Sequence, residues 1–136
     1  MTLPEYEVGA CFPSSVCVPG LGKVELTLTE PFCRNSQNIP EKTYTKWFDY
    51  DKISSAIVFR TRKSGDYFMI NNGMGRKSLQ DFFVNEKVPR QERNKIYLLA
   101  EGSHVIWIPG YRISDYYKVH KNTRTVLQVR AVEREG

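Results

Sequence analysis

Strict alternation of apolar and polar residues constrains the fold of this chain most. Residues 23–29 read KVELTLT, and residues 125–132 repeat the pattern near the end of the chain. A period of two is typical of a strand that buries one face. The inward residues would be Val24, Leu26 and Leu28 in the first strand and Leu127, Val129 and Ala131 in the second. Strands are therefore expected to dominate.

Turn residues divide the rest of the chain into further short segments. Residues 1–20 are rich in proline and glycine and are predicted to be turn-rich, and the polar stretch 34–42 is predicted to be an exposed loop. β-Branched and aromatic residues predict strands elsewhere. These strands are expected at 44–50, 55–61, 67–70, 97–100 and 103–108, the last two forming a hairpin around Glu101-Gly102.

A short helix is predicted to begin after Ser78, because Asp81 follows at the spacing of a capping box. Leu79, Phe82 and Phe83 fall at i, i+3 and i+4, which gives this helix one apolar stripe. The two phenylalanines could instead stack on nucleobases, but helical spacing beside a leucine favours the core.

A second short helix is expected after Pro89, a favoured first helical residue. Arg90 and Arg93 would share one of its faces. With two short helices around residues 78–95 and many strands, the fold class is α+β, β-dominated with sandwich-like sheets. No repeat or linker interrupts the chain, so residues 1–136 are predicted to form a single domain.

Composition excludes several classes. No apolar run is long enough to span a bilayer and no signal peptide follows Met1, so we expect a cytoplasmic protein with no membrane partner. Cys11, Cys17 and Cys33 lack the spacing of a zinc site or disulfide framework and are expected to be reduced and partly buried. His104 and His120 are too isolated to complete a metal site.

Positive charge is concentrated late in the sequence. Residues 1–59 hold 5 Lys and Arg against 7 Asp and Glu, whereas residues 60–136 hold 15 against 8. Such an excess favours a polyanionic partner, and the alternative is a solvated basic surface without a ligand. Arg60 or Arg93 could instead pair with Asp66 inside the protein.

Exposed aromatic residues could add stacking surfaces beside these cations. Tyr111, Tyr116 and Tyr117 lie next to basic residues and are the better surface candidates. Trp107 lies between two isoleucines, so it belongs either to a second packed layer or to an exposed platform. The sequence leaves both open.

No catalytic constellation is evident. The segment 73–78, GMGRKS, departs from the order of a nucleotide-binding P-loop. It could still grip a phosphate through its glycine backbone, Arg76, Lys77 and the first N–H groups of the Ser78 helix. A simple glycine turn is the alternative.

Two longer stretches carry a family resemblance. Residues 75–119 read GRKSLQDFFVNEKVPRQERNKIYLLAEGSHVIWIPGYRISDYYKV, and they follow FDYDKI at 48–53 and FRTRKSGDYF at 59–68. This ordered pattern closely resembles the C-terminal domain of tRNA(Ile)-lysidine synthetase, the TilS family, most strongly over residues 47–130. The resemblance implies a β-rich, non-catalytic domain that grips the tRNA acceptor stem.

In such an enzyme, ATP, Mg and lysine would serve an N-terminal ATP-pyrophosphatase domain whose Ser-Gly-Gly-x-Asp-Ser loop has no match here. The partners implied are tRNA(Ile) and that catalytic domain, and no cofactor is expected in this chain. The alternative is a module that docks against the catalytic domain or a second copy, as a homodimer, without touching RNA. Charge and resemblance together give the candidate RNA-binding residues Arg60, Arg62, Arg76, Lys77, Lys87, Arg90, Arg93, Arg112 and Lys118. The family has a basic residue where Ser78 stands, which shifts one expected contact to Arg76 or Lys77.

Overall fold

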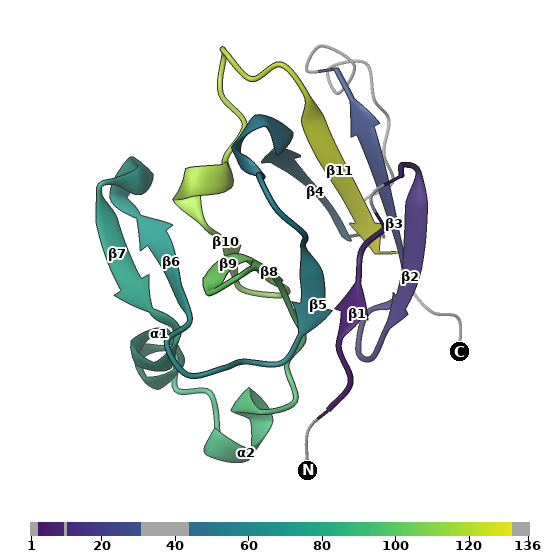
Figure 1. Cartoon of the computed structure of the whole chain (residues 1–136). Helices are drawn as coiled ribbons and strands as arrows, with labels where there is room; N and C mark the ends of the chain where they lie inside the picture. Colours follow the sequence, from purple (N-terminus) through teal and green to yellow (C-terminus); the bar gives the residue numbers. More distant parts are fainter. Residues whose placement is uncertain (1–2, 10, 31–43, 132–136) are drawn as a thin grey trace. The chain divides into compact units, whose positions relative to one another are not determined.

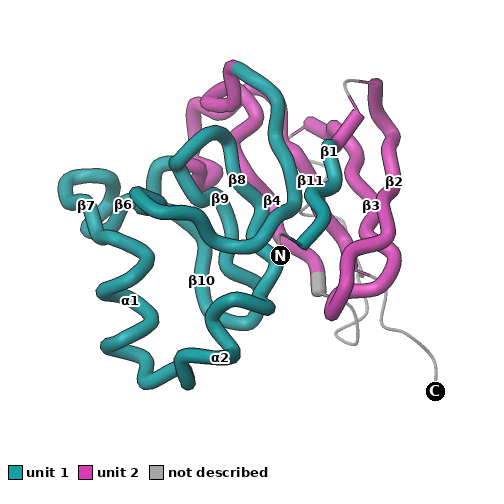
Figure 2. Tube along the Cα trace, turned by 60° about the horizontal axis from the view of Figure 1, so that its bottom comes forward, with its two compact units in different colours: residues 1–7, 55–116 teal, residues 8–54, 117–136 magenta. Residues whose placement is uncertain are grey.

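The structure is a computed structural model that describes residues 3–9, 11–30 and 44–131 (Figure 1). Its internal contacts divide the chain into two compact units, residues 1–7 with 55–116 (unit 1) and residues 8–54 with 117–136 (unit 2) (Figure 2). The single domain expected from the sequence stays a prediction. The loop predicted at 34–42 and Cys33 lie outside the described residues.

In the described part of unit 2, four antiparallel strands form one sheet. Their order in the sheet is β2 (Ser14–Val18), β3 (Gly22–Thr29), β11 (Val126–Ala131) and β4 (Tyr44–Asp49). A 3-10 turn, Tyr50–Lys52, follows β4. The turn-rich stretch 1–20 also contains a strand that was not predicted: β2 lies between Pro13 and Pro19 and pairs with β3.

The alternation predicted for residues 23–29 and 125–132 is confirmed for all but one of the residues expected to face inward. Val24 and Leu26 are buried, as are the three inward residues of β11. Leu28 is 39% exposed instead. The pairing of β2 with β3 ends at Leu26, so no β2 residue flanks Leu28 on that side.

The sheet of unit 1 contains seven strands among the described residues. Six lie in the order β1 (Tyr6–Glu7), β5 (Val58–Arg60), β8 (Leu98–Glu101), β9 (His104–Ile108), β6 (Tyr67–Ile70) and β7 (Gly75–Ser78). The short β10 (Arg112–Ile113) pairs with β9. Among the described strands of this sheet, only the β6–β9 pair is parallel. This pair places the antiparallel β6–β7 hairpin next to the antiparallel β8–β9 hairpin.

Two short helices complete unit 1, α1 (Leu79–Asn85) and α2 (Arg90–Arg93), and the 3-10 turns Asn71–Gly73 and Asp115–Tyr117 connect strands. The backbone N–H of Asp81 donates to Ser78 Oγ at 3.0 Å, which confirms the predicted cap. Leu79, Phe82 and Phe83 are buried in the core. The β-dominated α+β class is confirmed. The core cluster comprises Phe68, Leu79, Phe82, Phe83, Val88, Leu98, Val105 and Ile108.

The hairpin around Glu101-Gly102 is confirmed, and Gly102 adopts φ 61°, a conformation that favours glycine. Trp107 is 1% exposed, so it is a packed residue and not an exposed platform. The strand predicted at 55–61 is limited to β5. The glycine segment 73–78 contains β7, the hairpin partner of β6, where a turn or loop was expected.

Cys11 and Cys17 are exposed free thiols, so the expectation that they are partly buried is wrong. Across the described ranges, no cluster of His, Cys, Asp and Glu side chains could hold a metal ion. No helix among the same residues is both long and apolar enough to cross a membrane.

Candidate nucleic-acid interface

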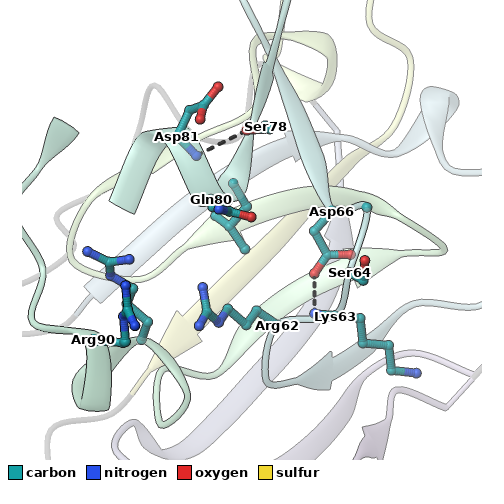
Figure 3. A pocket seen from close by; sticks show the side chains of 11 residues that line it. Arg62, Lys63, Ser64, Asp66, Ser78, Gln80, Asp81 and Arg90 are labelled. Carbon is teal, nitrogen blue, oxygen red and sulfur yellow. Dashed lines mark hydrogen bonds between the residues drawn. The ribbon is translucent and has the colours of Figure 1, made fainter. Parts of the chain in front are cut away.

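A cavity of about 700 Å³ in unit 1 gathers the largest group of the predicted cations. One wall is the turn that follows β5, another is the start of α1, and a third is α2 (Figure 3). Figure 3 shows Arg62 and Arg90 on facing sides of the cavity. The lining residues are Arg62, Lys63, Ser64, Gly65, Asp66, Ser78, Leu79, Gln80, Asp81, Arg90 and Arg93.

Neighbouring groups hold two of the three cavity arginines in place. Arg62 Nε donates to Asn94 Oδ1 at 2.9 Å, and Arg93 Nε donates to the Val88 carbonyl at 2.8 Å. Arg90 is exposed. In the part of the chain that the structure describes, none of the three forms an ion pair with a carboxylate. Direct pairing therefore does not neutralise their charges, although Asp81 also lines the cavity, and guanidinium groups suit phosphate oxygens.

Arg60 differs from these arginines because it is buried, at 3% exposure. Its two terminal nitrogens each donate at 2.9 Å to an oxygen of Asp66, and one also donates to the Gly102 carbonyl at 2.7 Å. The expectation that Arg60 contacts RNA is therefore not supported, and the internal pair with Asp66 is confirmed. Charge along a sequence does not distinguish a buried arginine from an exposed one.

Asp66 also shapes the cavity wall. Its carboxylate accepts the Lys63 backbone N–H at 2.8 Å, which fixes the turn that carries Arg62. The Lys63 side chain extends away from the cavity (Figure 3) and pairs with Glu5 at 2.8 Å. The hydrogen bond from Lys63 lowers the pKa of the exposed Glu5 carboxyl. Lys63 therefore contributes less to the cavity than its position in the sequence suggests.

A second cavity, of about 490 Å³, brings together Lys77 and Arg112. Arg112 pairs with Asp115 at 3.0 Å, and Asp115 accepts the Asn72 N–H at 2.9 Å. One of the two predicted cations is thus already neutralised. This site offers an anion less net charge than the first cavity does.

The remaining predicted cations line neither cavity. Arg76 lies over the Tyr67 ring, with its guanidinium carbon 3.7 Å from the ring centroid. Lys87 is exposed on the turn after α1, and Lys118 is exposed in unit 2. The nine predicted residues therefore do not form one cluster: three share the first cavity and two share the second.

The phosphate grip proposed for residues 73–78 is also not supported. The Leu79 N–H donates to the Asp66 carbonyl at 3.0 Å and the Asp81 N–H donates to Ser78. Two of the first three N–H groups of the helix thus already have protein acceptors. Strand pairing with β6 occupies the preceding residues.

Sequence reasoning missed a set of ring contacts in the same unit. Tyr67 stacks on His104 with ring centroids 4.8 Å apart, and His104 lies 5.2 Å from Tyr116. Of the three predicted surface tyrosines, Tyr111 and Tyr116 are exposed. Tyr117, the last residue of the 3-10 turn after β10, is buried at 1% exposure. Periodicity within one strand cannot reveal such contacts between strands.

Comparison with known proteins places these features in a family. The family model described as TilS substrate C-terminal domain matches residues 57–130. The protein named tRNA(Ile)-lysidine synthase from Caldanaerobacter subterraneus is 40% identical over 117 residues, 86% of this chain and 25% of that protein. Its namesake from Clostridium tetani is 38% identical over 79% of this chain and 23% of its own length. This chain thus spans about a quarter of the length of these relatives.

A solved structure described as the crystal structure of a TilS C-terminal domain shares the fold. It superposes with a TM-score of 0.64 at 23% identity, covering 96% of this chain and all of that chain. The family model covers β5 through all but the last residue of β11, which includes every arginine of the first cavity. On this evidence, the chain belongs to the TilS substrate C-terminal domain family.

Proposed function

We propose that this chain binds tRNA(Ile) through the backbone phosphates of the acceptor stem, using the first cavity. The observation that carries the proposal is that Arg62, Arg90 and Arg93 line one cavity from two separate segments without an ion pair among the described residues. A double-stranded stem is read mainly through its phosphates, 2′-hydroxyls and shape. Arginines of this kind provide affinity without base specificity.

The chemistry suggested by the relatives' name would lie elsewhere in the longer protein. We assign the ATP-dependent joining of lysine to the tRNA, with its ATP and Mg, to a catalytic domain outside the quarter of the relatives that this chain matches. The chain itself would be non-catalytic, cytoplasmic and without a cofactor. Its partners would be the tRNA and that catalytic domain.

Salt dependence tests the phosphate contacts directly. Each phosphate contact makes the slope of log affinity against log salt more negative by about 0.9, so three arginines predict a slope near −3. The double charge reversal Arg62→Glu/Arg90→Glu should make the slope less negative by about 2 and weaken binding at least tenfold. Arg93 is left unchanged because it also bonds the Val88 carbonyl. Filter binding of tRNA(Ile) between roughly 50 and 200 mM salt would measure both values.

A matched control separates the cavity from net charge. Lys121→Glu/Arg124→Glu changes the charge of the chain by the same amount at exposed positions in unit 2. It should leave most of the affinity intact. Equal loss in both double variants would contradict a local site. Full tRNA affinity in the cavity variant would favour the docking or homodimer alternative, in which the basic residues touch no RNA.

A further inference from the structure

A row of planar side chains crosses one face of the unit 1 sheet. Arg76 lies on β7, Tyr67 on the neighbouring β6 and His104 on β9, the next strand. Tyr67 is the register partner of His104, and Arg76 is opposite Met69, two residues along β6 from Tyr67. Because residues two apart share a face of a strand, Arg76, Tyr67 and His104 are on the same side of the sheet.

The contacts in this row are close enough to be stacks. The Arg76 guanidinium carbon is 3.7 Å from the Tyr67 centroid, and the Tyr67 and His104 rings lie 4.8 Å apart at 30°. Tyr116 extends the row beyond His104 at 5.2 Å and 38°. Since β6 lies between β7 and β9, Arg76 and His104 approach the Tyr67 ring from the strands on either side of it. The row therefore ends in Arg76 on one side and in Tyr116 on the other.

Buried groups hold the middle of the row in place. His104 Nε2 hydrogen-bonds Ser114 Oγ at 2.8 Å, and the same oxygen accepts the Met69 N–H at 2.9 Å. Ser114 is 1% exposed. Burial lowers the pKa of His104 to about 4, so its ring is neutral near pH 7 and Arg76 is the cation of the row. The Tyr67 ring supports the guanidinium from beneath, and such a cation–π contact favours a fixed orientation.

Arg76 lies at the open edge of this sheet. β7 is the last strand in the order, with β6 on its other side (Figures 1 and 2). Arg76 is also exposed, in contrast to the intermediate Tyr67 and His104. Unpaired bases of RNA stack on aromatic rings and on guanidinium planes. Base pairs inside a double-stranded stem cannot use such a platform, because both of their faces are already stacked on neighbouring pairs.

We infer that the Arg76 guanidinium, supported by Tyr67 and His104, is a stacking platform for an unpaired nucleobase of the bound RNA. The inference rests on the proposed function and adds to it a single-stranded contact apart from the phosphates at the first cavity. It also changes the expected role of Arg76 from a phosphate contact to a base contact. Lysine has the same charge as arginine but no planar group on which a base could stack, so Arg76→Lys removes the platform and keeps the charge.

The test uses the 136-residue chain and two RNA hairpins with the same stem and the same single-stranded 3′ extension. In one RNA the extension carries bases, and in the other the same nucleotides are abasic, so the phosphates are equal in number. We expect the wild-type chain to bind the RNA with bases about tenfold more tightly, the effect of roughly one stacked base. In Arg76→Lys the ratio should fall to about one, while affinity for the abasic RNA stays within about twofold because the charge is kept.

The outcomes separate the two proposals. Salt-sensitive binding of both RNAs with a wild-type ratio near one overturns the platform and leaves the proposed function intact. A tenfold ratio that survives in Arg76→Lys places the base elsewhere and also overturns it. Absence of salt-sensitive binding to either RNA overturns both proposals. Lys95→Arg, a change that keeps the charge at an exposed position after α2, is the control, and its ratio should equal that of the wild-type chain.

Discussion

At the residue scale, Arg60 shows how an arginine can affect an anion site without touching the ligand. Its guanidinium neutralises Asp66, a carboxylate in the cavity wall, with both side chains at most 4% exposed. Removing one partner of such a pair leaves a buried, uncompensated charge. We predict that Arg60→Leu lowers the free energy of unfolding by about 3–5 kcal/mol, measured by urea denaturation.

The double variant Arg60→Leu/Asp66→Leu should be less destabilised than the sum of the two single variants, because it leaves no isolated charge. The tRNA affinity of the Arg60→Leu protein should be compared with that of the wild-type chain in the absence of urea, at a temperature where both are folded. A loss of affinity with unchanged stability would contradict the internal role and return Arg60 to the RNA-contacting set.

At the element scale, Ser78 links the stability of α1 to the charge of the first cavity. Its hydroxyl caps the helix, and its side chain lines the cavity. Ser78→Ala should lower the free energy of unfolding by about 1 kcal/mol. Ser78→Asp keeps a capping oxygen, so its stability should match the wild type, but the new carboxylate faces the arginines and should weaken tRNA binding several-fold. Equal tRNA affinity in the Asp and Ala variants would contradict a phosphate site there.

The elements that sequence reasoning found are those whose signal is local. The alternation in β3 and β11, the span of β6 and the Ser78 cap all depend on residues close together in the chain. The misses depend on distant partners. Residues 14–18 read as part of a turn region until β3 supplies their hydrogen bonds, and the glycine segment at 73–78 becomes a strand because β6 pairs with it.

The candidate site divides in the same way. Positive charge and the family resemblance identified Arg62, Arg90 and Arg93, but they could not separate them from the buried Arg60. The Tyr67–His104 stack was out of reach, because it joins residues 37 positions apart through a parallel register. Burial and pairing between strands decide which charged and aromatic residues are available to a ligand.

At the scale of the whole molecule, the charge contrast along the sequence disappears in the folded units. The late half of the sequence is strongly basic, yet unit 1 holds 10 Lys and Arg against 8 Asp and Glu, and unit 2 holds 10 against 7. Both units combine early and late segments, which mixes the two halves. Net charge therefore does not assign RNA binding to one unit, and the local arrangement of arginines has to do so.

The same interleaving of segments bears on cooperativity. Unit 1 includes the first residues of the chain, held through β1 pairing with β5 and by the Tyr97 hydroxyl, which donates to the Pro4 carbonyl at 2.8 Å. Unit 2 needs β11 from the end of the chain between β3 and β4. Neither unit is one continuous segment. Unfolding one unit therefore frees the chain at the points where it enters and leaves the other unit. We therefore predict one cooperative unfolding transition, in line with the single domain expected from the sequence.

The two tryptophans allow this to be measured, because Trp47 is in unit 2 and Trp107 is in unit 1. In Trp47→Phe, fluorescence reports unit 1 alone, and in Trp107→Phe it reports unit 2 alone. Within each variant, the urea transition followed by fluorescence should coincide with that followed by far-UV circular dichroism, which reports both sheets. Trp107 is buried, so Trp107→Phe should shift the whole transition to lower urea without separating the two signals. Fluorescence and dichroism midpoints that differ within one variant would instead show two domains that unfold independently.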